Sequence, residues 1–143
     1  MTNMQAAIGL AQLERIDIFV EKKRWIGKKY TERLQSVESL QLPIRSTIYA
    51  ENIYWVYGVV IKDKQTMDAK EAMNIFAKAG IGTRPFFWSL HEQPVLKNYN
   101  ITVKESFPIS EHMSRQGFYL PSGLAITEGQ INYVCDTLLK IFK

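Results

Sequence analysis

One stretch of the chain, residues 80–94, gathers side chains that could recognise a ligand outside any helical pattern. It holds one arginine, one histidine and three consecutive aromatic residues: Arg84, His91, Phe86, Phe87 and Trp88. An arginine is a planar donor of several hydrogen bonds and aromatic rings offer stacking faces, so this stretch fits a wall that binds an anionic or sugar ligand. The alternative is a packed crossover with the rings in the core, Arg84 paired to a local acid and His91 a structural histidine.

Other chemistries find little support in the spacing of the residues. The eight glycines are scattered and form no phosphate-binding loop. His91 and His112 lie far apart without cysteines or a HExxH pattern, so we expect no metal site. Cys135 is the only cysteine and falls on the apolar face of an expected helix, which predicts a buried, inert thiol.

The net charge of +4 is concentrated in residues 21–29, where five basic residues accompany the single acid Glu21. Outside this run the basic and acidic residues balance. A run of this kind is typically the solvated face of a helix, and a nucleic-acid surface is the alternative. We expect the helix face and no nucleic-acid partner.

Length and hydropathy set the class of protein. With 143 residues, of which 46% are hydrophobic, the chain can bury one core without disulfides or metal. The longest uncharged apolar run, residues 53–61, is far shorter than the roughly 20 residues of a membrane helix. No signal peptide is recognisable, so we expect a cytoplasmic protein with no membrane partner.

Several helices must position these residues. Thr2 and Gln5 form a capping-box pattern, followed by apolar stripes that predict a helix buried around much of its girth, with small residues in its first turns at a packed interface. The helical pattern resumes near Ile26, with Gly27 as an expected kink. A third helix over residues 69–76 is capped by Asp68 or Thr66 and ends at Gly80, and a last helix follows the capping box of Thr127 and Gln130.

The remaining segments predict a small sheet. Residues 40–42 and 117–121 are short strands, and residues 53–61 form a strand covered on both faces at the centre of the sheet. Residues 82–88 are extended, because Pro85 keeps Arg84 out of helical geometry. Residues 91–108 cross the surface in short turns, with a helical turn near 110–115. The fold class is therefore α+β, a small, mainly antiparallel sheet packed against helices.

Specific motifs then resemble a known family. Residues 1–15 (MTNMQAAIGLAQLER), followed in order by 80–84, 91–94, 107–108 and 120–123, resemble the C-terminal landmarks of the DegT/StrS family of pyridoxal-phosphate-dependent nucleotide-sugar aminotransferases. The Arg84-Pro-Phe-Phe run and the block at His91 look most like the perosamine synthases of that family. The resemblance implies the C-terminal domain of a fold-type I transferase, with residues 1–36 as a helical connection to the large domain and 37–143 as the small domain.

The resemblance also implies what the intact enzyme uses. Its cofactor is pyridoxal phosphate, its amino donor is glutamate, and its substrate is a nucleotide-linked keto-deoxysugar such as GDP-4-keto-6-deoxymannose. The cofactor lysine and its neighbours would precede Met1, so we expect this chain to have no catalytic or cofactor-binding residue, to bind no cofactor, and to be catalytically incomplete. A homodimer is implied, with the following residues at its interface: Thr2, Asn3, Gln5, Ala6 and Gly9. The alternative function is a stand-alone binding or dimerisation module.

Overall fold

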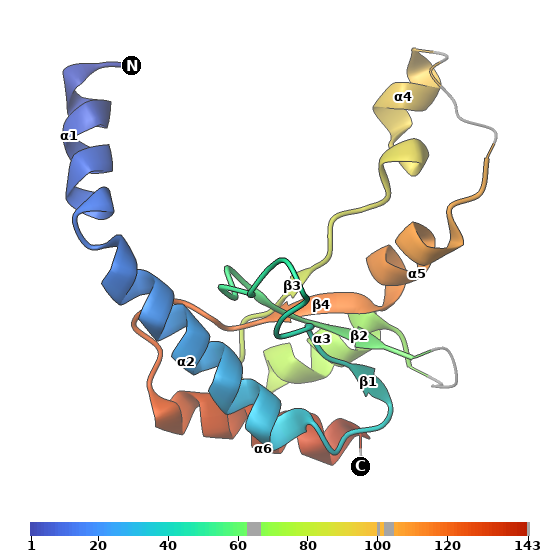
Figure 1. The fold of residues 1–143 in the computed structure, drawn as a ribbon. Coiled ribbons are helices and arrows are strands. Elements are labelled where there is room, and N and C mark those ends of the chain that lie inside the picture. The colour runs from blue at the N-terminus through green and yellow to red at the C-terminus, as the bar shows by residue number, and fades with distance from the viewer. Residues whose placement is uncertain (63–66, 100, 102–104, 143) are drawn as a thin grey trace.

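In the computed structural model, which describes residues 1–62, 67–99, 101 and 105–142, a four-stranded antiparallel sheet lies against helices (Figure 1). The strands are β1 (Leu40–Gln41), β2 (Tyr57–Ile61), β3 (Arg84–Pro85) and β4 (Gly117–Leu120), in the spatial order β1-β2-β4-β3. Every pair is antiparallel. The predicted α+β class and the inner position of the 53–61 strand are confirmed.

One face of the sheet forms the main core with three helices, α2 (Ile16–Leu34), α3 (Ala69–Lys78) and α6 (Glu128–Phe142). Side chains alternate along β2 and β4, and the register that pairs Tyr57 with Leu120 and Val59 with Phe118 puts these four on the helical side. α2 adds Ile26, Tyr30 and Leu34, and α6 adds Ile131, Val134, Cys135 and Leu138. The core therefore joins residues from both ends of the chain.

The helix caps follow the local sequence. Asp68 caps α3 in a capping box with Glu71, and Gly80 ends that turn at a left-handed φ of 74°. Thr66, the other expected cap, lies outside the described residues. Thr127 accepts a hydrogen bond from the backbone N–H of Gln130 at 3.2 Å, as predicted for α6. No described helix combines the length and the apolar character that crossing a membrane requires.

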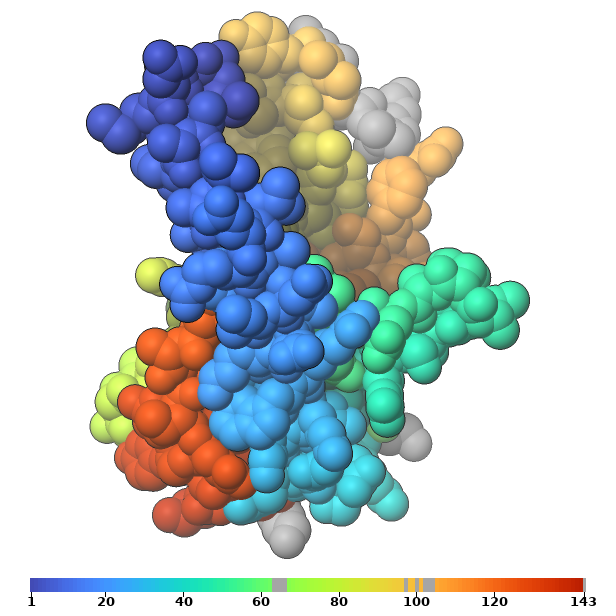
Figure 2. All heavy atoms as spheres, turned by 60° about the vertical axis from the view of Figure 1, so that its left-hand side comes forward, coloured from blue at the N-terminus to red at the C-terminus, as the bar shows by residue number. Residues whose placement is uncertain are grey.

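The first helix, α1 (Asn3–Leu13), has the predicted capping box but not the predicted burial. None of its residues is buried, and Met4, Ile8, Leu10 and Leu13 are all more than half exposed. The reason is a turn at Glu14 and Arg15, after which α2 runs along the body while α1 stands away from it (Figures 1 and 2). The expectation of a helix buried within this chain is therefore wrong.

Gly27 does not mark the predicted kink, because α2 continues through it. A Cβ atom at this position would overlap the ring of Tyr54, so the glycine lets that ring pack against the helix. Tyr54 itself has a left-handed φ of 53°, and its N–H donates to Oδ1 of Asn52 at 2.7 Å. A strand cannot pass through this backbone conformation. As a result β2 begins at Tyr57 rather than at residue 53 as expected, and Trp55 leaves the sheet.

The segment between β3 and β4 contains more helix than the short turns expected. It holds η1 (Leu90–Glu92), α4 (Pro94–Asn98) and α5 (Pro108–Gln116), the last with a proline in its first turn. Figure 1 shows α4 and α1 rising from the same side of the body, at its two ends.

Candidate ligand-binding site

A cavity of about 960 Å³ is bounded by β3 and the residues after it, the first turns of α3, the end of α5, and residues 55–56. Four of the five residues predicted to contact a ligand line it: Arg84, Phe86, Phe87 and Trp88. β3 is an edge strand paired to β4, with Arg84 opposite Tyr119. Pro85 is compatible with this place because an edge strand does not need its N–H. The predicted segment therefore forms one wall of the cavity.

The ring of Phe86 is fixed against the face of the sheet that is turned away from the helical core. Cβ atoms at Gly58 or Gly117 would overlap this ring, so the two glycines create its seat. Phe86 also stacks on Tyr119, with ring centroids 4.6 Å apart and planes 25° from parallel. The ring faces that these two residues turn toward each other cannot bind a ligand. Both residues line the cavity.

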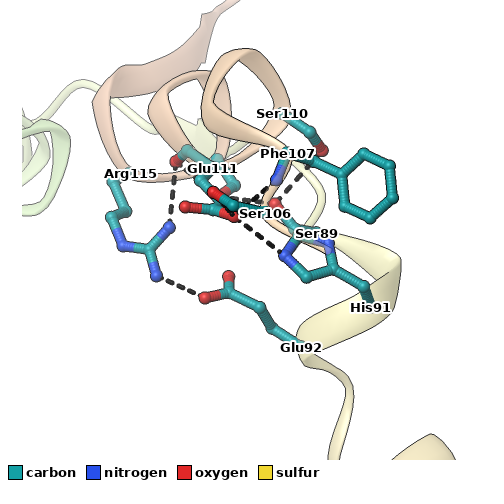
Figure 3. Close-up of polar contacts among 9 residues, drawn as sticks. Ser89, His91, Glu92, Ser106, Phe107, Ser110, Glu111 and Arg115 are labelled. Carbon is teal, nitrogen blue, oxygen red and sulfur yellow. Dashed lines mark hydrogen bonds and ion pairs between the residues drawn. The ribbon is translucent and has the colours of Figure 1, made fainter. Parts of the chain in front are cut away.

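Trp88 is covered by the guanidinium group of Arg115, which lies 5.1 Å from its ring centre. Arg115 also donates to the backbone oxygen of Glu111 at 3.1 Å and forms an ion pair with Glu92 (Figure 3). The guanidinium group of Arg115 therefore already has partners within the protein, and it links α5 to η1 at the edge of the cavity.

The basic and acidic groups of the cavity differ in how they are engaged. Its acid, Asp68, accepts the backbone N–H of Glu71 at 2.8 Å as the cap of α3. Arg84 and Lys70 are exposed, and neither forms an ion pair with any described residue. The local acid that the packed-crossover alternative requires for Arg84 is thus not found in the described part of the chain. Two cations remain available to an anionic ligand.

His91, the fifth predicted residue, does not line the cavity. Its Nε2 atom lies 3.1 Å from Oε1 of Glu111, its ring packs on Phe107 at 4.9 Å, and 15% of its side chain is exposed (Figure 3). Glu111 also accepts the backbone N–H of Phe107 at 2.9 Å, and this bond, together with His91 and Ser106, holds the pKa of Glu111 below its usual range. His91 has the partner that the structural alternative requires.

Hydroxyl groups connect the same region to the cavity wall. Ser89, which is buried, lies with its hydroxyl 3.2 Å from that of Ser114 and accepts the hydroxyl of Ser110 at the same distance. Since Ser89 directly follows Trp88, these contacts with α5 hold the end of the aromatic segment in place.

Several lining residues were not among the sequence candidates: Trp55, Val56, Asp68, Ala69, Lys70, Met73, Ser114, Arg115 and Tyr119. The alternation of β4 carries a signal for Tyr119, because its two neighbours Phe118 and Leu120 face the core. Trp55 carries no such signal, since the expected strand included it and only the turn at Tyr54 directs it out.

The basic run in α2 is engaged by the rest of the protein. Lys23 donates to the backbone oxygens of Trp55 at 2.8 Å and Ser122 at 2.6 Å, and partial burial lowers its pKa. The other members also have partners: Lys22 lies over the ring of Trp25, and Arg24, Lys28 and Lys29 pair with Glu51, Glu32 and Glu128. These contacts favour a role in holding the fold. Among the described residues, no group of three or more His, Cys, Asp or Glu is placed to hold a metal ion.

Comparison with known proteins gives a family match over nearly the whole chain. The model of the DegT/DnrJ/EryC1/StrS aminotransferase family matches residues 1–139. GDP-perosamine synthase from Escherichia coli O157:H7 is 29% identical over 142 residues, which are 99% of this chain and 36% of that protein. The chain spans little more than a third of the length of such curated relatives.

Solved structures share the fold at lower identity. An E. coli GDP-4-keto-6-deoxy-D-mannose-3-dehydratase with bound hydrated PLP matches with a TM-score of 0.77 and 20% identity over 94% of this chain and 34% of that one. A GDP-4-keto-6-deoxymannose-3-dehydratase mutant with bound GDP-perosamine matches with a TM-score of 0.81 and 21% identity, covering 94% of this chain and 35% of that one.

Proposed function

The chain belongs to the DegT/DnrJ/EryC1/StrS aminotransferase family, and from this we propose that it is the C-terminal domain of an aminotransferase for a nucleotide-linked keto-deoxysugar. The proposed substrate is GDP-4-keto-6-deoxymannose, with glutamate as the amino donor. GDP-perosamine synthases are among the relatives, and GDP-perosamine is bound in a protein of the same fold, which supports a GDP-linked sugar. The proposal includes a cytoplasmic location, in keeping with a single unpaired cysteine.

One observation carries this proposal. The run Arg84-Pro-Phe-Phe, which looks most like the perosamine synthases, lines the cavity of about 960 Å³ together with Trp88. A guanidinium group without an ion-pair partner among the described residues can bind phosphate in a bidentate manner, while the rings exclude water beside it. In this proposal the chain binds and orients the substrate.

The described residues do not fit the cofactor of the family. A pyridoxal phosphate site needs a lysine for the covalent link, an acid for the ring nitrogen and a phosphate cradle. The cavity's acid, Asp68, is the cap of α3, and its lysine, Lys70, is exposed on the first turn of that helix rather than enclosed beside an acid that could hold a ring nitrogen. Lys23, the lysine whose pKa partial burial lowers, donates to two backbone oxygens. We therefore propose that this chain holds no pyridoxal phosphate by itself and is catalytically incomplete.

Calorimetric titration with GDP-perosamine tests the binding role. We expect Arg84→Ala to weaken binding at least tenfold, because a charge-assisted hydrogen bond contributes about 1.5–3 kcal/mol. Arg45→Ala is the matched control, since Arg45 is exposed and lies outside this cavity. Equal affinities of wild type and Arg84→Ala would remove Arg84 from the site, and wild type without affinity for GDP-perosamine would contradict the proposal.

We also propose that residues 1–36 form the helical connection to the large domain of the intact enzyme and that α1 packs at a homodimer interface, with 37–143 as the small domain. The absence of any buried residue in α1 supports this, as do the small side chains of Ala6 and Gly9 beside the polar Thr2, Asn3 and Gln5. Sedimentation should show self-association that Ala6→Glu abolishes and Ala77→Glu, on the exposed face of α3, does not. A dimer that binds no nucleotide would favour the alternative, a stand-alone dimerisation module.

A further inference from the structure

One of the aromatic rings that line the cavity, that of Trp55, contacts no other ring and no cation among the described residues. Of the five rings that line it, Phe86 and Tyr119 stack on each other, Phe87 lies edge-on to Tyr119, and Trp88 is covered by Arg115. Trp55 forms no ring contact and no cation–π contact with any described residue, and it is 67% exposed. A large ring left in water beside an apolar cavity is suited to cover a planar ligand.

The backbone that carries Trp55 is held firmly. The residue before it, Tyr54, is 5% exposed, and its ring stacks with Tyr57 at 5.9 Å. The carbonyl of Trp55 itself accepts a hydrogen bond of 2.8 Å from Nζ of Lys23, which also binds the carbonyl of Ser122. Because the backbone is fixed, only the two side-chain torsions of the indole need to be ordered when a ligand stacks on it.

Two positively charged side chains line the same cavity as Trp55. Lys70 lies in the first turn of α3 and lines the same cavity as Arg84, and both are exposed without an ion pair to a described residue. Two cations that line one cavity with an aromatic ring match a ligand that joins a planar ring to a diphosphate. Every nucleobase has a π face, so stacking tolerates different bases while the cations hold the phosphates.

We propose that Trp55 stacks on the base of a nucleoside diphosphate and that Lys70 binds its diphosphate together with Arg84. This inference rests on the proposed function and adds two binding residues to it. They come from elements remote in sequence from the segment of Arg84, and the topology of the sheet brings all three to one cavity.

The test measures two ligands, GDP and inorganic pyrophosphate, against the whole 143-residue chain by calorimetry. Trp55→Ala should weaken GDP binding about tenfold or more and leave pyrophosphate binding unchanged, because only the base is stacked. Trp55→Phe should retain most of the affinity for GDP. Lys70→Met should weaken both ligands. The matched controls are Tyr49→Ala, an exposed ring outside the cavity, and Lys78→Met, an exposed lysine at the other end of α3.

The outcomes separate this inference from the proposed function. If wild type binds GDP and neither Trp55→Ala nor Lys70→Met changes the affinity, the inference is wrong while the proposed function stands. If wild type binds neither GDP nor pyrophosphate, both are overturned. Pyridoxal phosphate is also planar and phosphorylated, so it serves as a competitor: displacement of GDP by an equal concentration of it would overturn the nucleotide assignment. Trp55 and Lys70 are exposed, and circular dichroism of the variants verifies that they fold.

Discussion

Replacing Gly27 with alanine tests the packing of Tyr54, the residue before the cavity residue Trp55, against α2. A Cβ atom at this position would lie closer than 3.0 Å to three ring carbons of Tyr54. The ring cannot move aside easily, because it is buried against α2, stacks on Tyr57, and belongs to a residue at a φ of 53°. The substitution therefore forces either a shift of α2 or the release of the ring.

Two opposing effects set the size of the change. Alanine is favoured over glycine inside a helix by about 1 kcal/mol. Releasing a buried tyrosine ring costs about 1.5–3 kcal/mol in burial, and the lost ring pair adds about 0.5–1.5 kcal/mol. We therefore expect Gly27→Ala to lower the free energy of unfolding by about 2 kcal/mol.

Urea unfolding followed by circular dichroism measures this loss. Gly129→Ala in α6 is the control, because a Cβ atom at Gly129 meets only the hydroxyl oxygen of Thr127 at 4.0 Å, so the gain in helix propensity dominates. A double-mutant cycle with Tyr54→Ala should show that the alanine at position 27 becomes neutral or stabilising once the ring is removed. A Gly27→Ala protein as stable as wild type would refute the packing of Tyr54 on α2.

Three further outcomes are expected. The pKa of Glu111 is lowered from 4.5, so the stability that its carboxylate contributes to the folded state is present above that pH and is lost as the pH falls through the folded value. The urea midpoints of Glu111→Gln and wild type should therefore differ at pH 7 and converge in acid. A difference that stays constant with pH would contradict the contacts of Glu111 with Phe107, His91 and Ser106. Burial raises the pKa of the Cys135 thiol to about 11. Mass spectrometry should therefore find no alkylation by iodoacetamide at pH 8 until urea unfolds the chain. Rapid labelling of the folded chain would show that the thiol lies at the surface. Amides of α1 should exchange rapidly in dilute protein and slow on self-association, whereas slow exchange at every concentration would show that α1 is held by its own chain.

Features that depend on a few neighbouring residues could be predicted from the sequence. The capping boxes at Thr2 and Thr127 formed as expected, since both partners of each lie within one turn. The inner position of β2 and the burial of Cys135 followed from the apolar patterns of their elements. Most of the predicted wall of the cavity also lies together, because residues 84–88 are contiguous and extended.

The features that the sequence did not predict depend on contacts between segments that are distant in the chain. The left-handed backbone of Tyr54 has one local contact, the hydrogen bond from its N–H to the side chain of Asn52, but the packing of its ring on Gly27 joins segments that are far apart in the sequence. The sequence therefore predicted a kink at Gly27, whereas the glycine makes room for the ring of Tyr54. Likewise, Trp55 and Lys70 reach the cavity only because β3 pairs with β4 and α3 packs beside it, an arrangement that no spacing rule expresses.

The helix α1 raises a question of stability that bears on function. It has 11 residues and no buried side chain, and isolated helices shorter than about 12–15 residues are marginal in water. Its capping box adds about 1 kcal/mol, which does not replace tertiary packing. Apolar residues such as Ile8 and Leu10 are 59% exposed on a helix that gains nothing from their exposure. These apolar side chains would stabilise the helix if another protein surface buried them. We therefore expect the folding of α1 to be coupled to self-association of the protein.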